Sequence, residues 1–102
     1  MTEYEKAVLM AMLRIGRPAR GLEIWDEVTA RIGKEESLVK VYITLGRFQE
    51  HGLVTSFEGE ANLEHAGKRK VLYWDLTEGG RKALADAMQP IRGGAPGLAE
   101  PA

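Results

Sequence analysis

Hydrophobic residues recur along the first half of the chain at the three- and four-residue intervals of amphipathic helices. Three such stretches are each followed by a glycine, at Gly16, Gly33 and Gly52. Glycine just past a helix relieves the left-handed backbone of its C-terminal cap. The pattern therefore predicts helices near residues 3–15, 21–32 and 38–51.

The first of these stretches is apolar around most of its circumference. One stripe carries a hydrophobic residue on successive turns: Tyr4, Val8, Ala11, Met12 and Ile15. Leu9 and Leu13 fall outside that stripe at 100° per residue. Because a helix that is apolar on two sides is buried on both, we expect one side to face its own domain and the other to meet another helix or a second subunit.

The third stretch has one hydrophobic and one mixed face. Ser37 is suited to cap its N-terminus, because a serine hydroxyl can accept a hydrogen bond from a free backbone N–H. The hydrophobic face carries Leu38, Val41, Leu45 and Phe48. The opposite face carries Lys40, Ile43, Thr44, Arg47 and His51. Two helices joined by a short connection, the second with a basic and polar outer face, indicate a helix-turn-helix.

The pattern changes after Gly52. The β-prone segment Leu53–Glu58 and the aromatic-rich segment Val71–Leu76 predict two strands. The polar residues between them, Gly59 to Gly67, predict a long, flexible tip. The two strands and this tip would form a hairpin.

A short helix is expected after the hairpin, capped by Thr77 and weakened in its first turn by Gly79 and Gly80. Its apolar stripe includes Leu84 and Met88. Three of the chain's 4 prolines lie beyond residue 88, where no regular element is expected. We therefore expect residues 1–88 to form one domain and residues 89–102 a flexible tail rich in proline and glycine.

Three helices, a two-stranded hairpin and a short last helix are the parts of a winged helix-turn-helix, a mainly α (α+β) fold. That fold presents its third helix to the major groove of DNA. Lysine or arginine there suits guanine, and threonine or isoleucine can meet a thymine methyl group. The expected contacts with base edges are Lys40, Ile43, Thr44 and Arg47, and phosphate contacts are expected from Lys68, Arg69 and Lys70 at the start of the second strand.

Composition narrows the functional classes. The 102 residues carry 14 Lys+Arg against 15 Asp+Glu, a net charge of −1, which excludes a uniformly basic coat but not a local basic face. The absence of cysteine excludes disulfides, cysteine-bound zinc and thiol catalysis. The longest apolar run, Ala7–Leu13, is far too short to span a membrane. We therefore expect a cytoplasmic protein. We also expect a non-enzymatic protein without metal or cofactor, because no nucleophile–base pair or metal-ligand spacing is present.

Three segments resemble the PadR family of transcriptional regulators. Residues 37–54, SLVKVYITLGRFQEHGLV, resemble the family's recognition helix and first wing strand, which carry a Ser, a Leu-Tyr pair and a Leu-x-Arg-Leu-Glu run ending in Gly-Leu-Val. Residues 68–81, KRKVLYWDLTEGGR, resemble the basic, tyrosine-containing strand that leads to Leu-Thr-Glu-Ala-Gly-Arg. Residues 20–24, RGLEI, are a weaker match to His-Gly-Tyr-Glu-Ile. Together these matches cover residues 3–88 in the family's order.

The resemblance implies a homodimeric repressor in which Ser37, Tyr42 and the basic wing residues contact the DNA backbone. Leu38 and Ile43 depart from the family, since proline is frequent at both positions. The last helix is shorter than is usual there, so the first helix would have to contribute more to the dimer. We therefore expect the first and last helices to pack against their mates through Leu9, Leu13, Leu84 and Met88.

The resulting hypothesis is a PadR-like repressor that binds a palindromic operator on double-stranded DNA as a homodimer. A competing hypothesis is a winged-helix module that binds protein and not DNA, with Ile43 as its anchor. A protein that reads DNA would keep the side chains of Lys40 and Arg47 free to contact it. A third hypothesis, a sensor of a small aromatic effector, would require a cavity at the dimer interface or near aromatic residues such as Trp25, Tyr73 and Trp74.

Overall fold

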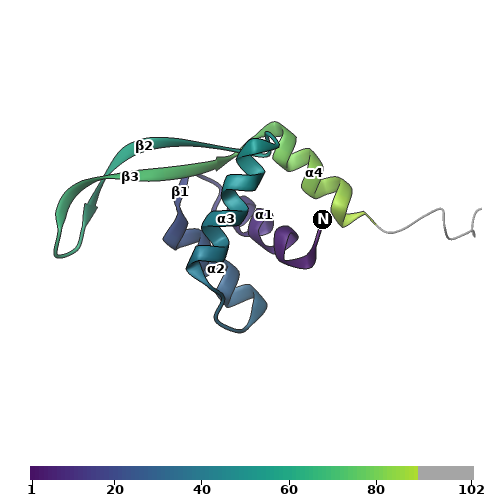
Figure 1. The fold of residues 1–102 in the computed structure, drawn as a ribbon, viewed down its shortest axis with the longest axis horizontal. Coiled ribbons are helices and arrows are strands. Elements are labelled where there is room, and N and C mark those ends of the chain that lie inside the picture. Colours follow the sequence, from purple (N-terminus) through teal and green to yellow (C-terminus); the bar gives the residue numbers. More distant parts are fainter. Residues whose placement is uncertain (90–102) are drawn as a thin grey trace, which may run out of the picture.

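The computed structural model describes residues 1–89, which form four helices and three strands (Figure 1). In chain order these are α1 (Glu3–Ile15), β1 (Ala19–Arg20), α2 (Gly21–Ile32), α3 (Leu38–Glu50), β2 (Val54–Leu63), β3 (Gly67–Leu76) and α4 (Glu78–Met88). The helices pack around one another, and the β2–β3 hairpin extends beyond them on the side opposite α4 (Figure 1). This α+β arrangement confirms the winged helix predicted from the sequence.

The helix ends agree with the capping residues read from the sequence. The hydroxyl of Ser37 accepts a hydrogen bond from the backbone N–H of Lys40, and that of Thr77 accepts one from Gly80. Gly16 and Gly33 close α1 and α2 in the left-handed conformation. Of the predicted tail, only Gln89 is described, and its extended backbone ends α4.

The sheet has three strands in the order β1-β3-β2, all antiparallel, so it contains the predicted two-stranded hairpin and one strand more than expected. The additional strand, β1, has only two residues, and it pairs Ala19 with Trp74 and Arg20 with Tyr73. Two residues are too few to show a hydrophobic period, so this pairing could not be seen in the sequence. It ties the start of α2 to the inner part of the wing.

The hairpin strands are longer, and the tip shorter, than predicted. β2 and β3 pair from Val54↔Leu76 to Leu63↔Gly67, which leaves three residues at the turn. One of them, His65, adopts a positive φ of 70°. Much of the segment expected to be a flexible tip is therefore paired strand. Because both faces of the outer hairpin are largely solvent-exposed, its sequence carries no inside–outside alternation that would mark it as strand.

The core lies between the helices and the inner end of the sheet. Its fully buried side chains include Val8 and Leu9 of α1, Ile24 of α2 and Leu45 of α3. The sheet adds Val54, Trp74 and Leu76, and α4 adds Leu84. None of the helices in residues 1–89 has the length and apolarity needed to cross a membrane.

The junction between the wing and α4 is held by backbone contacts. The backbone N–H of Thr77 donates to the carbonyl of Leu53 at 3.1 Å, and its hydroxyl donates to the carbonyl of Gly52 at 2.7 Å. Gly80 packs so closely on the same turn that an added Cβ would lie 2.1 Å from the Leu53 carbonyl oxygen. This glycine, which weakens the first helical turn, is thus required by the close approach of α4 to the turn before β2.

Candidate nucleic-acid interface

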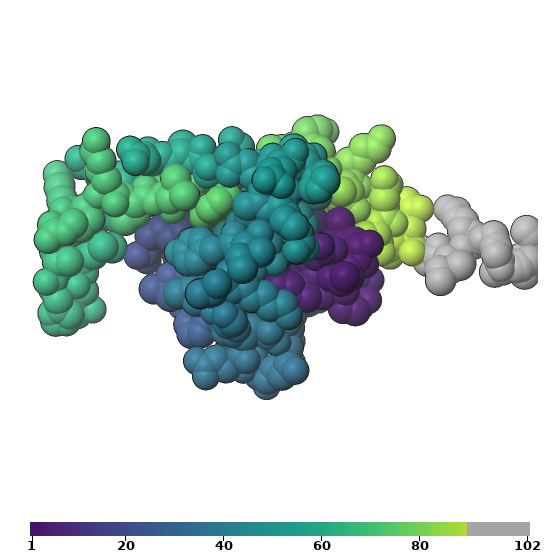
Figure 2. Space-filling model, viewed as in Figure 1, coloured from purple at the N-terminus to yellow at the C-terminus, as the bar shows by residue number. Residues whose placement is uncertain are grey.

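α3 is fixed at its N-terminal end by the connection from α2. Ser37 caps the helix, and the indole N–H of Trp25 in α2 donates to the backbone carbonyl of Glu36 at 2.6 Å. The connection is therefore anchored just before the first helical turn. The helix itself lies uncovered across the middle of the face shown in Figure 2.

Most of the predicted outer face of α3 is exposed. Ile43 has 57% of its surface exposed and Tyr42 has 41%. The side chains of Lys40 and Arg47 are about half exposed. These four predicted contact residues share one accessible surface.

Thr44 does not belong to this surface. Only 3% of it is exposed, so the prediction that it contacts DNA was wrong. The residue lies three positions after Val41 and four before Phe48, both of them buried. Because residues at these spacings share a helix face, Thr44 sits at the edge of the core side of α3.

Both predicted cations of α3 form ion pairs within the chain. The Lys40 ammonium lies 3.7 Å from the Glu36 carboxylate and 4.1 Å from the centroid of the Tyr4 ring. Arg47 donates to the Glu5 carboxylate at 2.7 Å. The expectation that a DNA reader would keep these two side chains free is therefore not met in this structure.

The partner of Arg47 has a second role at the start of α1. Glu5 accepts a hydrogen bond from the backbone N–H of Thr2 at 2.8 Å, and it completes the capping box of that helix. This backbone hydrogen bond, with the adjacent Arg47 guanidinium, lowers the pKa of the Glu5 carboxyl below its usual value. Glu5 is therefore charged at neutral pH and connects the start of α1 to the outer face of α3.

Tyr42 is positioned by a glycine of α2. Its ring lies against Gly21, where an added Cβ would come within 2.3 Å of a ring carbon and 2.6 Å of the hydroxyl oxygen. The absence of a side chain at Gly21 thus gives the ring its place, half in contact with the chain and half exposed. An amphipathic ring held in this way can pack along its edge and present its hydroxyl to a partner.

The three predicted basic residues of the wing do not share one face. Lys68 pairs with Asn62 and Lys70 with Glu60, on the face of the hairpin that continues from Trp74. Arg69 pairs with Ala61 on the opposite face, since successive strand residues alternate. Lys68 also lies 4.0 Å from the Glu60 carboxylate. The wing thus presents two lysines on one side and one arginine on the other.

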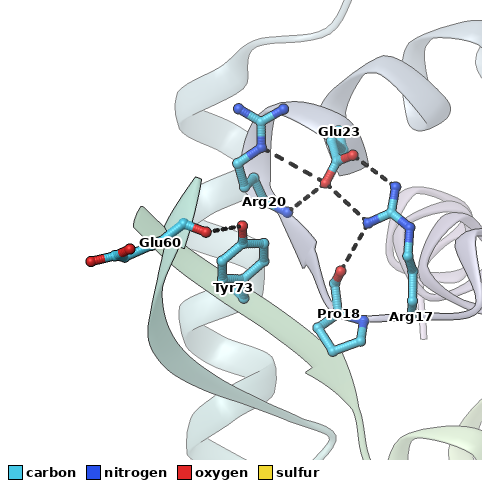
Figure 3. Close-up of polar contacts among 6 residues, drawn as sticks. All are labelled: Arg17, Pro18, Arg20, Glu23, Glu60 and Tyr73. Atoms are coloured by element: carbon cyan, nitrogen blue, oxygen red, sulfur yellow. Dashed lines mark hydrogen bonds and ion pairs between the residues drawn. The ribbon is translucent and has the colours of Figure 1, made fainter. Parts of the chain in front are cut away.

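A polar cluster lies beside the inner end of the wing. Figure 3 shows the Glu23 carboxylate of α2 between the side chains of Arg17 and Arg20, with the Arg17 contact at 2.9 Å. The hydrogen bond from Arg17 lowers the pKa of the Glu23 carboxyl. Within the hairpin, the Tyr73 hydroxyl of β3 donates to the backbone carbonyl of Glu60 in β2 at 3.2 Å (Figure 3). The hairpin is attached to the helical body beside this cluster, by the pairing of β1 with β3.

The residues predicted for a dimer interface divide into two pairs. Leu9 is fully buried and Leu84 is 3% exposed, so both belong to the chain's own core and the prediction for them was wrong. Leu13 and Met88 are 43% and 52% exposed. Met88 borders an open groove of about 430 Å³ between the start of α1 and the ends of α2 and α4. Only this second pair is available to a partner.

The model of one protein family matches residues 8–86 of the chain, described as the transcriptional regulator PadR-like family. This match spans the helix-turn-helix, the wing and nearly all of α4. The chain belongs to the PadR-like family. No curated protein sequence matches it.

Solved structures share the fold of this PadR-like chain. TA0346 of Thermoplasma acidophilum has a TM-score of 0.68 at 22% identity, over 83% of this chain and 76% of that one. A PadR family transcription regulator of Clostridium difficile R20291 has a TM-score of 0.62 at 21% identity, over 84% and 83%. Bacillus subtilis PadR, solved in complex with operator DNA, has a TM-score of 0.66 at 18% identity, over 85% and 49%. The chain therefore spans about half the length of that last protein.

The aromatic residues considered for an effector site do not come together in this PadR-like chain. Trp74 is buried in the core, and Tyr73 is on the opposite face of β3. The Tyr73 ring stacks on Phe57, with centroids 5.7 Å apart. Trp25 holds the connection before α3. Their positions therefore do not support a shared stacking site for a planar ligand. Residues 1–89 also contain no cluster of side chains suited to a metal ion.

Two residues of the α3 surface were missed by the sequence reasoning. Val39 is the most exposed large hydrophobic residue described, at 65%. Gly46 is helical, and an added Cβ there would meet no atom within 4 Å. The signal for both was present in the sequence, because residues 39, 43 and 46 fall along one line of a helix.

Proposed function

We propose that this PadR-like chain is a transcriptional repressor that binds DNA through α3 and the wing. The observation that carries the proposal is the uncovered outer face of α3, which combines Lys40 and Arg47 with the positioned ring of Tyr42. A helix of this kind fits the major groove. The relative from Bacillus subtilis, solved in complex with operator DNA, supports the same partner for this chain.

The proposed mechanism is occupancy of a palindromic operator by a homodimer. Two symmetric copies of α3 would enter major grooves about one helical turn apart. Lys68 and Lys70 on one side of the wing would contact phosphates beside them. A bound dimer would block transcription until it is released.

The intramolecular pairs of Lys40 and Arg47 are compatible with this function. The cation of each pair is about half exposed, while the side chains of Glu36 and Glu5 are 13% and 20% exposed. Ion pairs that water can reach typically contribute about 0–1 kcal/mol. DNA phosphates and base edges can therefore replace Glu36 and Glu5 at small cost. With a net charge of −1, the chain should bind non-specific DNA weakly. Its preference for particular DNA sequences would then come from a few specifically positioned contacts.

A second candidate function is a winged-helix module that docks on another protein. The observation that favours it is the exposure of Ile43 and Val39 beside cations that are already paired within the chain. Such a module would bind with little dependence on salt. The two functions therefore differ most clearly in how affinity changes with ionic strength.

Duplex binding should depend strongly on salt and on both cations of α3. A duplex selected from a randomised pool should bind with a log affinity that falls by about 0.9 per phosphate contact for each unit of log salt. Lys40→Ala and Arg47→Ala should each weaken binding by roughly 1–3 kcal/mol. Fluorescence anisotropy of a labelled duplex at several salt concentrations would measure both effects.

Lys82→Ala is the matched control for these two variants. It removes the same charge from an exposed residue of α4, far along the chain from α3, and should change the affinity by no more than about 0.5 kcal/mol. The proposal would be contradicted if no duplex from the pool bound at low salt. It would also be contradicted if all three variants bound equally well.

The proposed homodimer makes a separate prediction. Leu13→Asp should raise the dimer dissociation constant about tenfold or more, because an interface would then bury a carboxylate. The control is Leu22→Asp on α2, since Leu22 is exposed to the same 43% and lies outside the proposed interface. Sedimentation velocity at micromolar concentration would compare the two variants with the parent, and a monomeric parent would refute the dimer.

A further inference from the structure

The outer face of α3 has an apolar centre. Val39 and Ile43, four residues apart, are 65% and 57% exposed. Gly46 continues their line, because residues three and four apart lie on the same side of a helix. We call Val39, Ile43 and Gly46 the α3 stripe. Val39 and Ile43 present branched side chains with methyl groups, and Gly46 presents backbone without a side chain.

No contact within the described chain requires a glycine at position 46 of the α3 stripe. An added Cβ at Gly46 would meet nothing within 4 Å, and its φ is not positive. Glycine is nevertheless one of the least favourable residues for the interior of a helix. Glycine is used where another molecule must approach the backbone closely, so a bound partner would explain its presence here.

The flanks of the α3 stripe are polar and are held in place by other elements. Lys40 and Arg47 lie on one flank and contact Glu36 and Glu5. Tyr42 lies on the other flank against Gly21. In each pair the cation is more exposed than its carboxylate. The outward charge along this side of the stripe is therefore positive, which complements a polyanion better than it does an apolar protein surface.

The major groove offers one apolar group to such a surface, the C5-methyl group of thymine. We propose that Val39 and Ile43 read thymine methyl groups, and that Gly46 lets the DNA approach the backbone of α3. This inference rests on the proposed DNA binding and adds the kind of base that is read. It assigns Val39 and Ile43 as specificity-determining residues.

Replacement of thymine by uracil tests the inference directly. The exchange removes a methyl group from the duplex and leaves its phosphates and hydrogen-bonding groups in place. Each contacted thymine of a selected duplex, changed singly to uracil, should raise the dissociation constant about fourfold. Ile43→Ala and Val39→Ala should each abolish the difference in affinity between the thymine and uracil duplexes at one position. This loss is what a double-mutant cycle gives for a side chain that contacts the methyl group.

Two further variants separate this role from a structural one. Leu22→Ala removes an equally apolar, exposed side chain from α2 and should keep the parent's ratio of uracil to thymine affinity. Gly46→Ala should raise the melting temperature by about 2–8 °C. It should also weaken duplex binding about fivefold or more, because the added methyl group would overpack the interface.

The outcomes separate this inference from the proposed function. Equal affinity for thymine and uracil at every position of a tightly bound duplex would overturn the inference and leave DNA binding intact. Unchanged affinity in Gly46→Ala would overturn the close approach at that residue. Failure to bind any duplex would overturn the proposed function as well, and would leave the α3 stripe to a protein partner.

Discussion

Replacement of Gly80 by alanine is expected to lower the free energy of unfolding by about 2–4 kcal/mol. The new Cβ would lie 2.1 Å from the carbonyl oxygen of Leu53 and 2.8 Å from a methyl carbon of Leu76. The Leu53 carbonyl also accepts the backbone N–H of Thr77, so the backbone cannot move away without losing that hydrogen bond. The helix propensity gained by alanine, about 1 kcal/mol, is too small to compensate.

Urea unfolding followed by circular dichroism would measure this loss. Gly46→Ala is the matched control, because the same substitution in α3 meets open space and should stabilise the protein by roughly 0.5–1 kcal/mol. The two variants thus have opposite expected signs. An unfolding midpoint for Gly80→Ala at or above that of the parent would show that α4 can shift away from Leu53 at no cost.

Leu9→Ala should cost about 2–5 kcal/mol of stability, because the substitution leaves a cavity in a packed core. Leu9 is fully buried within one chain, so the loss should be independent of protein concentration. Leu13→Ala, on the same helix but 43% exposed, should change the stability of the monomer by no more than about 0.5 kcal/mol.

Thermal unfolding at two protein concentrations, tenfold apart, would separate the roles of the two leucines. A loss for Leu9→Ala that shrinks at the lower concentration would place this residue at an interface between subunits. A loss that is the same at both concentrations would place it in the core.

The helices could be predicted closely because their signals are local. The 3.6-residue period, the hydroxyl caps at Ser37 and Thr77 and the glycines after α1 and α2 all act within a few residues of the helix ends. The predicted ranges for the first two helices agree with α1 and α2, and the predicted third helix extends one residue beyond α3.

The wing could be predicted only in outline because strand pairing is not local. β1 owes its existence to Trp74 and Tyr73, more than fifty positions away along the chain. The outer part of the hairpin is held by the backbone ladder between β2 and β3 and has no buried face. A hydrophobic pattern therefore stops where the contact with the body stops, although the strands continue.

Most of the α3 face that the sequence singles out is exposed in the structure, but the surroundings of several of its side chains differ from the prediction. A helical wheel puts Thr44 near the outer face, and only the packed neighbours of α3 show that its side is covered. The pair between Arg47 and Glu5 joins residues 42 positions apart, which no local pattern reveals. Val39 and Gly46 could have been found from the period of α3 alone.

The junction at Thr77 has a mechanical consequence. Because its hydroxyl and backbone N–H bind the turn at Gly52 and Leu53, the inner end of the hairpin and the first turn of α4 move as one rigid piece. Farther out, β1 pairs with Tyr73 and Trp74, so the free arm of the hairpin begins beyond these residues. A force applied to the outer wing would therefore act on the helical body through β1 and on α4 through the Thr77 junction, and so on any subunit packed against Met88.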